Sequence, residues 1–192
     1  MTSFHDSRYS GFRREQLWAI KALDMRVDAL AAVYDLMEMD RLVETVFYNG
    51  GITGPVSFTD FSLARGSELR TVYHGNDVVG VVWLNNPQGK ACMVHFCILR
   101  RFWEHQREIG IWTVRQYLEP LNPATGKPYL SALYGLTPAA YRHAIAFITS
   151  IGFRVLGKIP GACEFRRPGG PVFRDGIASV CTLDDVVRAE AL

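Results

Sequence analysis

The sequence contains few cysteines, and their spacing matches no known cysteine motif. The four stand at positions 92, 97, 163 and 181, and none belongs to a CxxC pair. This spacing argues against a zinc site, a redox motif or a disulfide framework, so we predict buried thiols in a reducing cytosol and no metal. On one straight strand, Cys92 and Cys97 would point to opposite faces, which argues against a disulfide between them.

Long apolar runs and a strong excess of one charge are also missing. The N-terminal residues, MTSFHDSRYSGFRREQ, lack the apolar core of a signal peptide, and no run reaches the roughly 18 residues that a membrane span needs. We therefore expect a soluble, cytoplasmic protein. The chain has 21 basic and 19 acidic residues, a net charge of +2, which argues against broad nucleic-acid binding. Anion binding is expected only at a local cluster.

The composition is that of one globular domain. The chain has 192 residues, of which 48% are hydrophobic and 12% aromatic, so it is long enough to bury a full core and too apolar to be disordered. We expect a single domain over residues 1–192, with a core from about residue 15 to about residue 185. Residues 1–14 are expected to be flexible or peripheral.

Hydrophobic periodicity and turn residues predict the elements of the first two thirds of the chain. The expected strands cover residues 17–23, 69–74, 78–84 and 91–99. The second and third of these are expected to form a hairpin with a turn at Gly75-Asn76-Asp77. The expected helices cover 27–37, 40–48 and a segment from about residue 105 to Glu119-Pro120. Residues 50–66 are expected to form a loop.

The clearest local pattern runs from Tyr129 to Ala162. Residues 129–136 predict a strand, after which Thr137 is expected as an N-cap and Pro138 as the first helical residue. Apolar residues then recur at helical spacing, at Ala144, Ile145, Phe147, Ile148 and Ile151. Gly152 is expected to end this helix, and a strand is expected from Arg154. Residues 161–171 predict a connection, and residues 172–183 a last strand or a hairpin around Asp175-Gly176.

This stretch resembles the carboxy-terminal half of the GNAT N-acetyltransferase superfamily, which often reads N-x-x-A-x-x-L-Y-x-K-x-G-F between two strands. The residues that agree or nearly agree are Ala144, Phe147, Gly152 and Phe153, whereas Tyr141, Ile148 and Ser150 replace the asparagine, tyrosine and lysine. The resemblance implies an α+β fold with a mixed, largely antiparallel sheet, helices on both faces and a splayed fourth and fifth strand. The alternative is another α+β sandwich with similar local patterns.

The resemblance also implies that acetyl-CoA, or another acyl-CoA, is a substrate. Its pantetheine arm would pair with the free backbone of the fourth strand, and its pyrophosphate would lie at the N-terminus of the next helix. The usual loop Q/R-x-x-G-x-G/A is replaced here by RFWEHQREIG, in which only Gly110 matches. The implied cofactor-binding residues are Ile98, Leu99, Arg100, Arg101, His105, Gln106, Arg107, Ile109, Gly110 and Tyr141. A solvated polar helix cap is the alternative interpretation of this loop.

Acyl transfer to an amine needs a base for the amine proton and benefits from an acid for the thiolate. Between Ala91 and Leu99 there is no glutamate, and His95 is the one titratable side chain apart from two thiols. We therefore predict His95 as the candidate base, because a neutral imidazole suits pH 7; a hydrogen-bonded sheet histidine is the alternative. Tyr141, seven residues before the usual tyrosine position, and Tyr134, near the end of the fifth strand, are the candidate acids.

The function that these features favour is acyl-CoA-dependent transfer, most simply of acetyl, to a small-molecule or peptide amine. Residues 95–98 and 157–160 also resemble GNAT-like proteins of tailed phages and prophages. A catalytically inactive head-assembly protein with a protein partner is therefore one alternative, and a non-catalytic acyl-CoA-binding domain is another. The sequence leaves open whether the protein forms a homodimer. The acceptor pocket would be built from the first helices and residues 50–66, which carry no motif.

Overall fold

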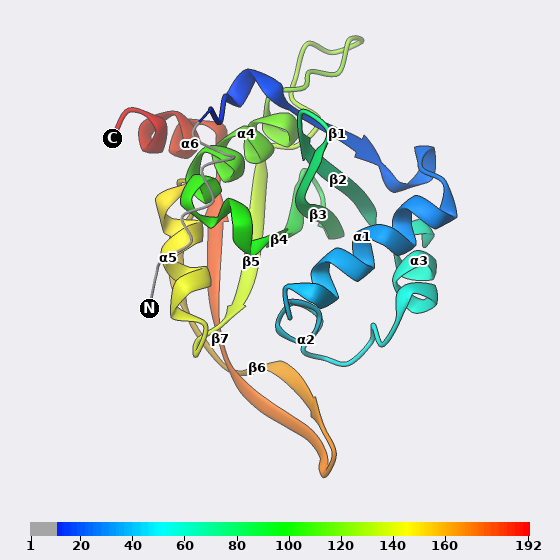
Figure 1. The fold of residues 1–192 in the computed structure, drawn as a ribbon. Coiled ribbons are helices and arrows are strands. Elements are labelled where there is room, and N and C mark those ends of the chain that lie inside the picture. The colour runs from blue at the N-terminus through cyan, green and yellow to red at the C-terminus, as the bar shows by residue number, and fades with distance from the viewer. Residues whose placement is uncertain (1–10) are drawn as a thin grey trace, which may run out of the picture.

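A computed structural model describes residues 11–192, which form one seven-stranded sheet flanked by helices (Figure 1). The strand order is β1-β2-β3-β4-β5-β7-β6. All neighbouring pairs are antiparallel except β4 and β5, which are parallel. The strands are β1 (Leu17–Lys21), β2 (Glu68–His74), β3 (Asp77–Gln88), β4 (Ala91–Ile98), β5 (Ala132–Pro138), β6 (Arg154–Arg167) and β7 (Gly170–Cys181).

Helices cover both faces of the sheet. They are α1 (Val27–Met39), α2 (Val43–Val46), α3 (Pro55–Leu63), α4 (Gln106–Leu118), α5 (Arg142–Ser150) and α6 (Leu183–Glu190). On one face, Phe47 after α2 stacks on Trp83 of β3 at 5.3 Å between ring centroids. On the other, Phe147 of α5 lies edge-on to Phe96 of β4 at 5.4 Å. The predicted α+β fold with helices on both faces is thereby confirmed.

The predicted splay of β4 and β5 is also confirmed. The two strands pair at three positions only, which join Ala91, Cys92 and Met93 to Ala132, Leu133 and Tyr134. On its other side, β4 stays paired with β3 as far as Ile98. Residues 94–98 therefore have a strand neighbour on one side only, and β4 and β5 diverge toward their carboxyl ends (Figure 1).

The start of the helix after β5 differs from the prediction. β5 continues through Thr137 and Pro138, and α5 begins only at Arg142. The capping interpretation of Thr137 and Pro138 is therefore wrong. The physical reason is tertiary: β7 pairs with β5 as far as Gly176 opposite Pro138, so the sheet keeps both residues extended. The predicted end of the helix is confirmed, because Gly152 follows it with a φ of +102°.

Two segments that were predicted as loops are regular structure. Residues 50–66 include α3, where Pro55 occupies the first helical position and Ser57 accepts a hydrogen bond from the Gly54 amide at 3.1 Å. Residues 161–171 belong to the long hairpin β6–β7, in which Arg167 pairs with Gly170. The hairpin therefore turns at residues 168–169 and not at Asp175-Gly176.

The C-terminal helix α6 was not predicted, and part of the N-terminal segment packs against the domain. Thr182 and Asp185 cap α6 reciprocally. Phe12 stacks between His74 and His105, at 4.5 and 4.2 Å, so residues 11–14 are held at the periphery. The remainder of the predicted N-terminal segment, residues 1–10, lies outside the described residues.

Neither a membrane-spanning helix nor a metal cluster is found between residues 11 and 192. No helix in this range is long and apolar enough to cross a membrane. No group of three or more histidine, cysteine, aspartate or glutamate side chains in this range could hold a metal ion. All four cysteines are buried free thiols.

Candidate functional site

The unpaired half of β4 is the centre of the candidate site. Side chains alternate along this strand, so His95 and Cys97 point toward α1–α3, and Phe96 points toward α5. In the plane of the sheet, the edge of residues 94–98 that faces β5 has no strand partner. Backbone N–H and C=O groups along such an edge can bind an extended ligand that contains amides.

His95 lies in an aromatic stack on the face toward α1–α3. Its ring is 4.6 Å from that of Trp83 and nearly parallel to it, and its Nε2 lies 3.1 Å from Asn85 Oδ1. Because an amide oxygen only accepts hydrogen bonds, Nε2 is the protonated nitrogen and Nδ1 is left as an acceptor. Burial lowers the pKa of His95 to about 4, so the imidazole is neutral at pH 7.

Tyr134 lies where β4 and β5 separate, on the same face as His95. It pairs with Met93, the last β4 residue in register with β5, and its hydroxyl donates to the Asn86 carbonyl at 2.5 Å. Burial raises the pKa of Tyr134. Asn85 and Asn86 belong to an irregular part of β3, where Asn86 has a φ of +47°. The structure thus brings His95 and Tyr134 to two adjacent residues of β3.

Tyr141 belongs to a second aromatic cluster, at the start of α5. The centroid of its ring lies 6.2 Å from that of Tyr48 and 5.9 Å from that of Phe165. The Tyr48 and Phe165 rings stack on each other, with centroids 4.6 Å apart. Burial raises the pKa of Tyr141, whereas the charges of Arg167 and Arg174 act to lower it. Within residues 11–192, no hydrogen bond or ring contact joins Tyr141 to His95 or Tyr134.

The segment after β4 begins with a 3₁₀ helix, Arg100–His105, that continues into α4. Its first amide, Arg100 N–H, donates to the Asp40 carboxylate at 2.6 Å, and Arg100 Nε donates to the Asp40 carbonyl at 2.7 Å. An aspartate at the C-terminus of α1 therefore occupies the start of this helical turn. A carboxylate in that place is itself an anion bound to a backbone N–H.

The other basic candidates in this segment also have partners within the protein. Arg101 donates to the Val78 carbonyl at 2.9 Å, and Arg107 donates to the Ala189 carbonyl in α6. His105 stacks on Phe12 and lies 3.6 Å from a Glu104 oxygen. A phosphate that binds here would compete with these contacts.

The apolar candidates in this segment serve packing in the structure. The Ile98 carbonyl accepts from the Trp103 indole N–H at 2.9 Å, and the Leu99 amide donates to the Val79 carbonyl at 2.8 Å. Ile109 is buried. A Cβ on Gly110 would lie 2.8 Å from Ile151, so this glycine lets α4 approach the end of α5 closely. Gln106 is the first residue of α4.

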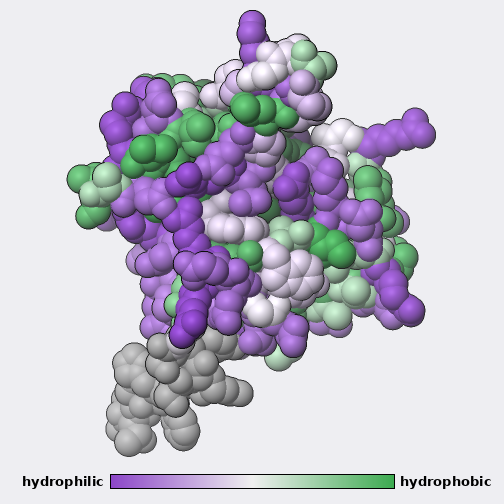
Figure 2. All heavy atoms as spheres, turned by 90° about the horizontal axis from the view of Figure 1, so that it is seen from above, coloured by the Kyte–Doolittle hydropathy of each residue, from purple (hydrophilic) through white to green (hydrophobic). Residues whose placement is uncertain are grey.

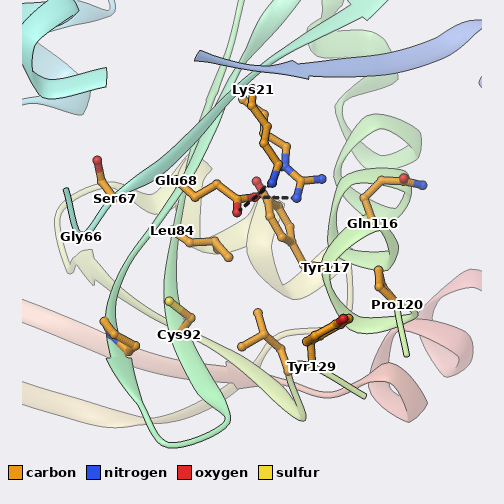
Figure 3. A pocket seen from close by; sticks show the side chains of 13 residues that line it. Lys21, Gly66, Ser67, Glu68, Leu84, Cys92, Gln116, Tyr117, Pro120 and Tyr129 are labelled. Carbon is orange, nitrogen blue, oxygen red and sulfur yellow. Dashed lines mark hydrogen bonds and ion pairs between the residues drawn. The ribbon is translucent and has the colours of Figure 1, made fainter. Parts of the chain in front are cut away.

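A cavity of about 630 Å³ lies at the opposite end of β4, where β4 pairs with β5 (Figure 3). Glu68 is bonded there to Arg70 and lies 3.6 Å from Lys21, and the Arg70 guanidinium covers the Tyr117 ring at 4.5 Å. The cavity is lined by none of the predicted site residues. The face seen in Figure 2 mixes hydrophilic and hydrophobic side chains without one large apolar patch among the described residues.

Sequence reasoning missed several residues that shape the candidate site. Asn85 and Asn86 were not among the predicted site residues, although the Asn-Asn-Pro run is a signal for irregular backbone. Asp40 was also not among them, although its carboxylate accepts from the Arg100 amide. Phe165 and its neighbouring arginines were assigned to a loop, and no local signal connects them with Tyr48 or Tyr141.

No protein-family model matches the sequence, and no curated protein matches it either. Solved structures match the fold along nearly the whole chain. An acetyl transferase from Salmonella typhimurium that modifies the N-terminal serine of ribosomal protein L7/L12 has a TM-score of 0.71 at 11% identity, covering 90% of this chain and 99% of its own. Spermidine N-acetyltransferase from Vibrio cholerae, in complex with CoA and spermine, has a TM-score of 0.63 at 13% identity, with coverage of 90% and 99%.

A GNAT-family acetyltransferase from Streptococcus pneumoniae is a third such structure. It has a TM-score of 0.56 at 14% identity, and the match covers 86% of this chain and 98% of the other. At such identities the likeness concerns the fold. The class that the fold defines is therefore that of GNAT-fold proteins, as the sequence resemblance predicted.

Proposed function

We propose that this protein is an acyl-CoA-dependent N-acyltransferase, which in the simplest case transfers acetyl to the amine of a peptide or small molecule. The observation that carries the proposal is the early end of the β4–β5 pairing, after Met93. The pantetheine arm of an acyl-CoA contains two amides, and an unpaired strand edge offers them hydrogen-bond partners. The solved structures with this fold that hold CoA support the same substrate class.

In the proposed reaction, the amine nitrogen attacks the thioester carbon, the C–S bond breaks, the nitrogen loses a proton, and the thiolate gains one. His95 is a weak base because its pKa is about 4. We therefore assign His95 the role of positioning the substrate amine. Its Nδ1 would accept a hydrogen bond from the N–H of an amine that is already deprotonated. Tyr134, at the point of strand separation, is the proposed donor to the thiolate, with Tyr141 as the alternative.

Binding and turnover test this proposal separately. Isothermal titration with acetyl-CoA should show binding, and the absence of binding at millimolar ligand would rule out the enzyme. With an accepted amine, thiol release should rise with pH as the amine deprotonates and show no break near 6.5, because His95 stays neutral. Unchanged turnover of His95→Gln would dismiss the imidazole, and Tyr134→Phe tests the proposed acid in the same assay.

One observation favours a second candidate, a GNAT-fold protein that does not transfer acyl groups. The arginines after β4 that would hold the CoA phosphates are bonded to Asp40, Val78 and Ala189. Acyl-CoA binding without thiol release would indicate a non-catalytic binding domain. If the protein neither binds acyl-CoA nor releases thiol, an assembly role is favoured, including the prophage type.

A further inference from the structure

The hairpin β6–β7 extends beyond the end of its neighbour β5. The last β5–β7 pair joins Pro138 to Gly176, and the hairpin continues for five more pairs, from Cys163–Arg174 to Arg167–Gly170. Figure 1 shows this part projecting from the sheet. It does not project freely, because the Arg166 amide donates to the Tyr48 carbonyl at 3.0 Å. The hairpin thus connects the β5 side of the gap with the segment after α2.

One face of this extension carries two arginines around a buried aromatic ring. Cys163, Phe165 and Arg167 alternate along β6 and share a face, and Arg174 shares it because it pairs with Cys163. The guanidinium carbons of Arg167 and Arg174 lie 5.9 and 6.0 Å from the Phe165 ring centroid. Phe165 in turn packs on Tyr48 and Tyr141. The arginine face is therefore the one turned toward Tyr141.

The charge on this face is positive and is not balanced locally. Neither Arg167 nor Arg174 forms an ion pair with a carboxylate of residues 11–192. The adjacent Asp175 is bound to Lys158 at 2.9 Å. Glu164 alternates to the opposite face, where it pairs with Phe173. Both arginines are exposed, and their charges act to lower the pKa of Tyr141. A ligand that approaches the Tyr141 cluster would therefore meet them.

We infer that Arg167 and Arg174 select an acceptor that carries a carboxylate, such as a peptide with aspartate or glutamate near its N-terminus. This inference rests on the proposed function and names its acceptor class. Guanidinium groups bind carboxylates with directed hydrogen bonds, and those of Arg167 and Arg174 both lie at the Phe165 ring. A polyamine or a lysine-rich peptide would instead be repelled.

Two peptides that share an N-terminal serine test the selection directly. One has aspartates at its second and third positions, and the other has lysines there. The aspartate peptide should be acetylated with a kcat/KM at least about tenfold higher, and the advantage should shrink as salt is raised. The double variant Arg167→Gln/Arg174→Gln should lose about tenfold on the aspartate peptide, mainly in KM, with unchanged acetyl-CoA binding. Arg166→Gln, on the other face of the hairpin, is the matched control.

The outcomes separate this inference from the proposed function. Turnover with equal preference for both peptides, or a double variant indistinguishable from Arg166→Gln, overturns the inference and leaves the enzyme intact. If no amine is acetylated, the inference is tested by fluorescence anisotropy with the labelled aspartate peptide. Binding that the double variant loses supports the arginine site without the enzyme. Absence of binding overturns the site.

Discussion

The two sides of the β4–β5 gap hold their positive charges in different ways. On the β4 side, Arg100 and Arg101 are bonded to Asp40 and to the Val78 carbonyl. On the other side, formed by β5 with the hairpin β6–β7 and called the β7 side, Arg167 of β6 and Arg174 of β7 contact an aromatic ring and no carboxylate of residues 11–192. Arginines with partners inside the protein stabilise the fold, whereas arginines without such partners are available to a ligand.

This difference bears directly on function. On the β4 side, a phosphate would have to replace contacts that already exist, so CoA binding there would depend on the strand edge more than on the side chains. On the β7 side, a carboxylate would meet two arginines that form no ion pair with a carboxylate of residues 11–192. The altered loop after β4 and the long hairpin are both basic, but the loop arginines are bonded within the protein, whereas Arg167 and Arg174 of the hairpin have no carboxylate partner among residues 11–192.

The largest expected effect is that of Gly80→Ala, which tests whether β3 holds β4 in its position beside the gap. A Cβ on Gly80 would lie 2.0 Å from the Cys97 carbonyl oxygen in β4. Gly80→Ala should therefore destabilise the protein by at least about 3 kcal/mol, because backbone atoms have to move. Chemical denaturation measures this. Gly11→Ala, which meets no atom within 4 Å, is the control, and equal midpoints of the two variants would contradict the expectation.

The second effect concerns the buried imidazole on the β4 side. The folded pKa of His95 is about 4, below its ordinary 6.5, so the unfolded chain binds more protons between these values and stability falls as pH falls from 6.5 toward 4. Between pH 7.5 and pH 5, His95 should account for a loss of about 1–2 kcal/mol. His95→Gln should flatten this slope in denaturation curves, and the exposed His143→Gln should keep it.

The third effect tests the partner of Arg100 directly. Asp40→Asn keeps an oxygen for the Arg100 amide but removes the negative charge. The loss of a charge-assisted hydrogen bond should cost about 1 kcal/mol of unfolding free energy. If the CoA phosphates lie near this turn, CoA affinity should rise about threefold, because a like charge is removed. Weaker CoA binding to a folded Asp40→Asn would show that the carboxylate does not oppose the ligand.

The smallest effect concerns an ion pair on the β7 side. Lys158 and Asp175 approach to 2.9 Å, but both side chains are largely exposed. Exposed ion pairs contribute little to stability. Lys158→Gln should leave the denaturation midpoint and the peptide preference unchanged. A change in peptide preference would mean that the selection depends on the overall charge of the hairpin and not on the arginine face.

Local patterns predicted most of the fold, and two of the exceptions were decided by strand pairing. The helix α5 ends at Gly152 as expected, and the strands β2, β3 and β4 lie where periodicity placed them. Thr137 and Pro138 form a good helix start locally, yet β7 keeps them in the sheet. Residues 161–167 contain glycine and charged residues typical of loops, yet they pair with β7. For Thr137 and Pro138 the partner strand lies far along the chain, whereas residues 161–167 pair with the strand that follows directly after the turn.

The candidate site follows the same division. From the sequence, His95, Tyr134 and Tyr141 were predicted as candidates, because the strand and helix patterns and the resemblance placed them near the expected gap. It could not show that His95 is stacked on Trp83 or that Arg100 is held by Asp40, since 60 residues separate the last two.

By itself, the sequence predicted the mixture and order of strands and helices, because these follow from periodicity and turn residues along the chain. The splay of β4 and β5 was expected only from the resemblance to the GNAT superfamily. The tertiary structure alone decided which charges remain available. The partner of an arginine depends on which distant segment packs beside it, and for Arg167 and Arg174 that segment offers aromatic rings and no carboxylate.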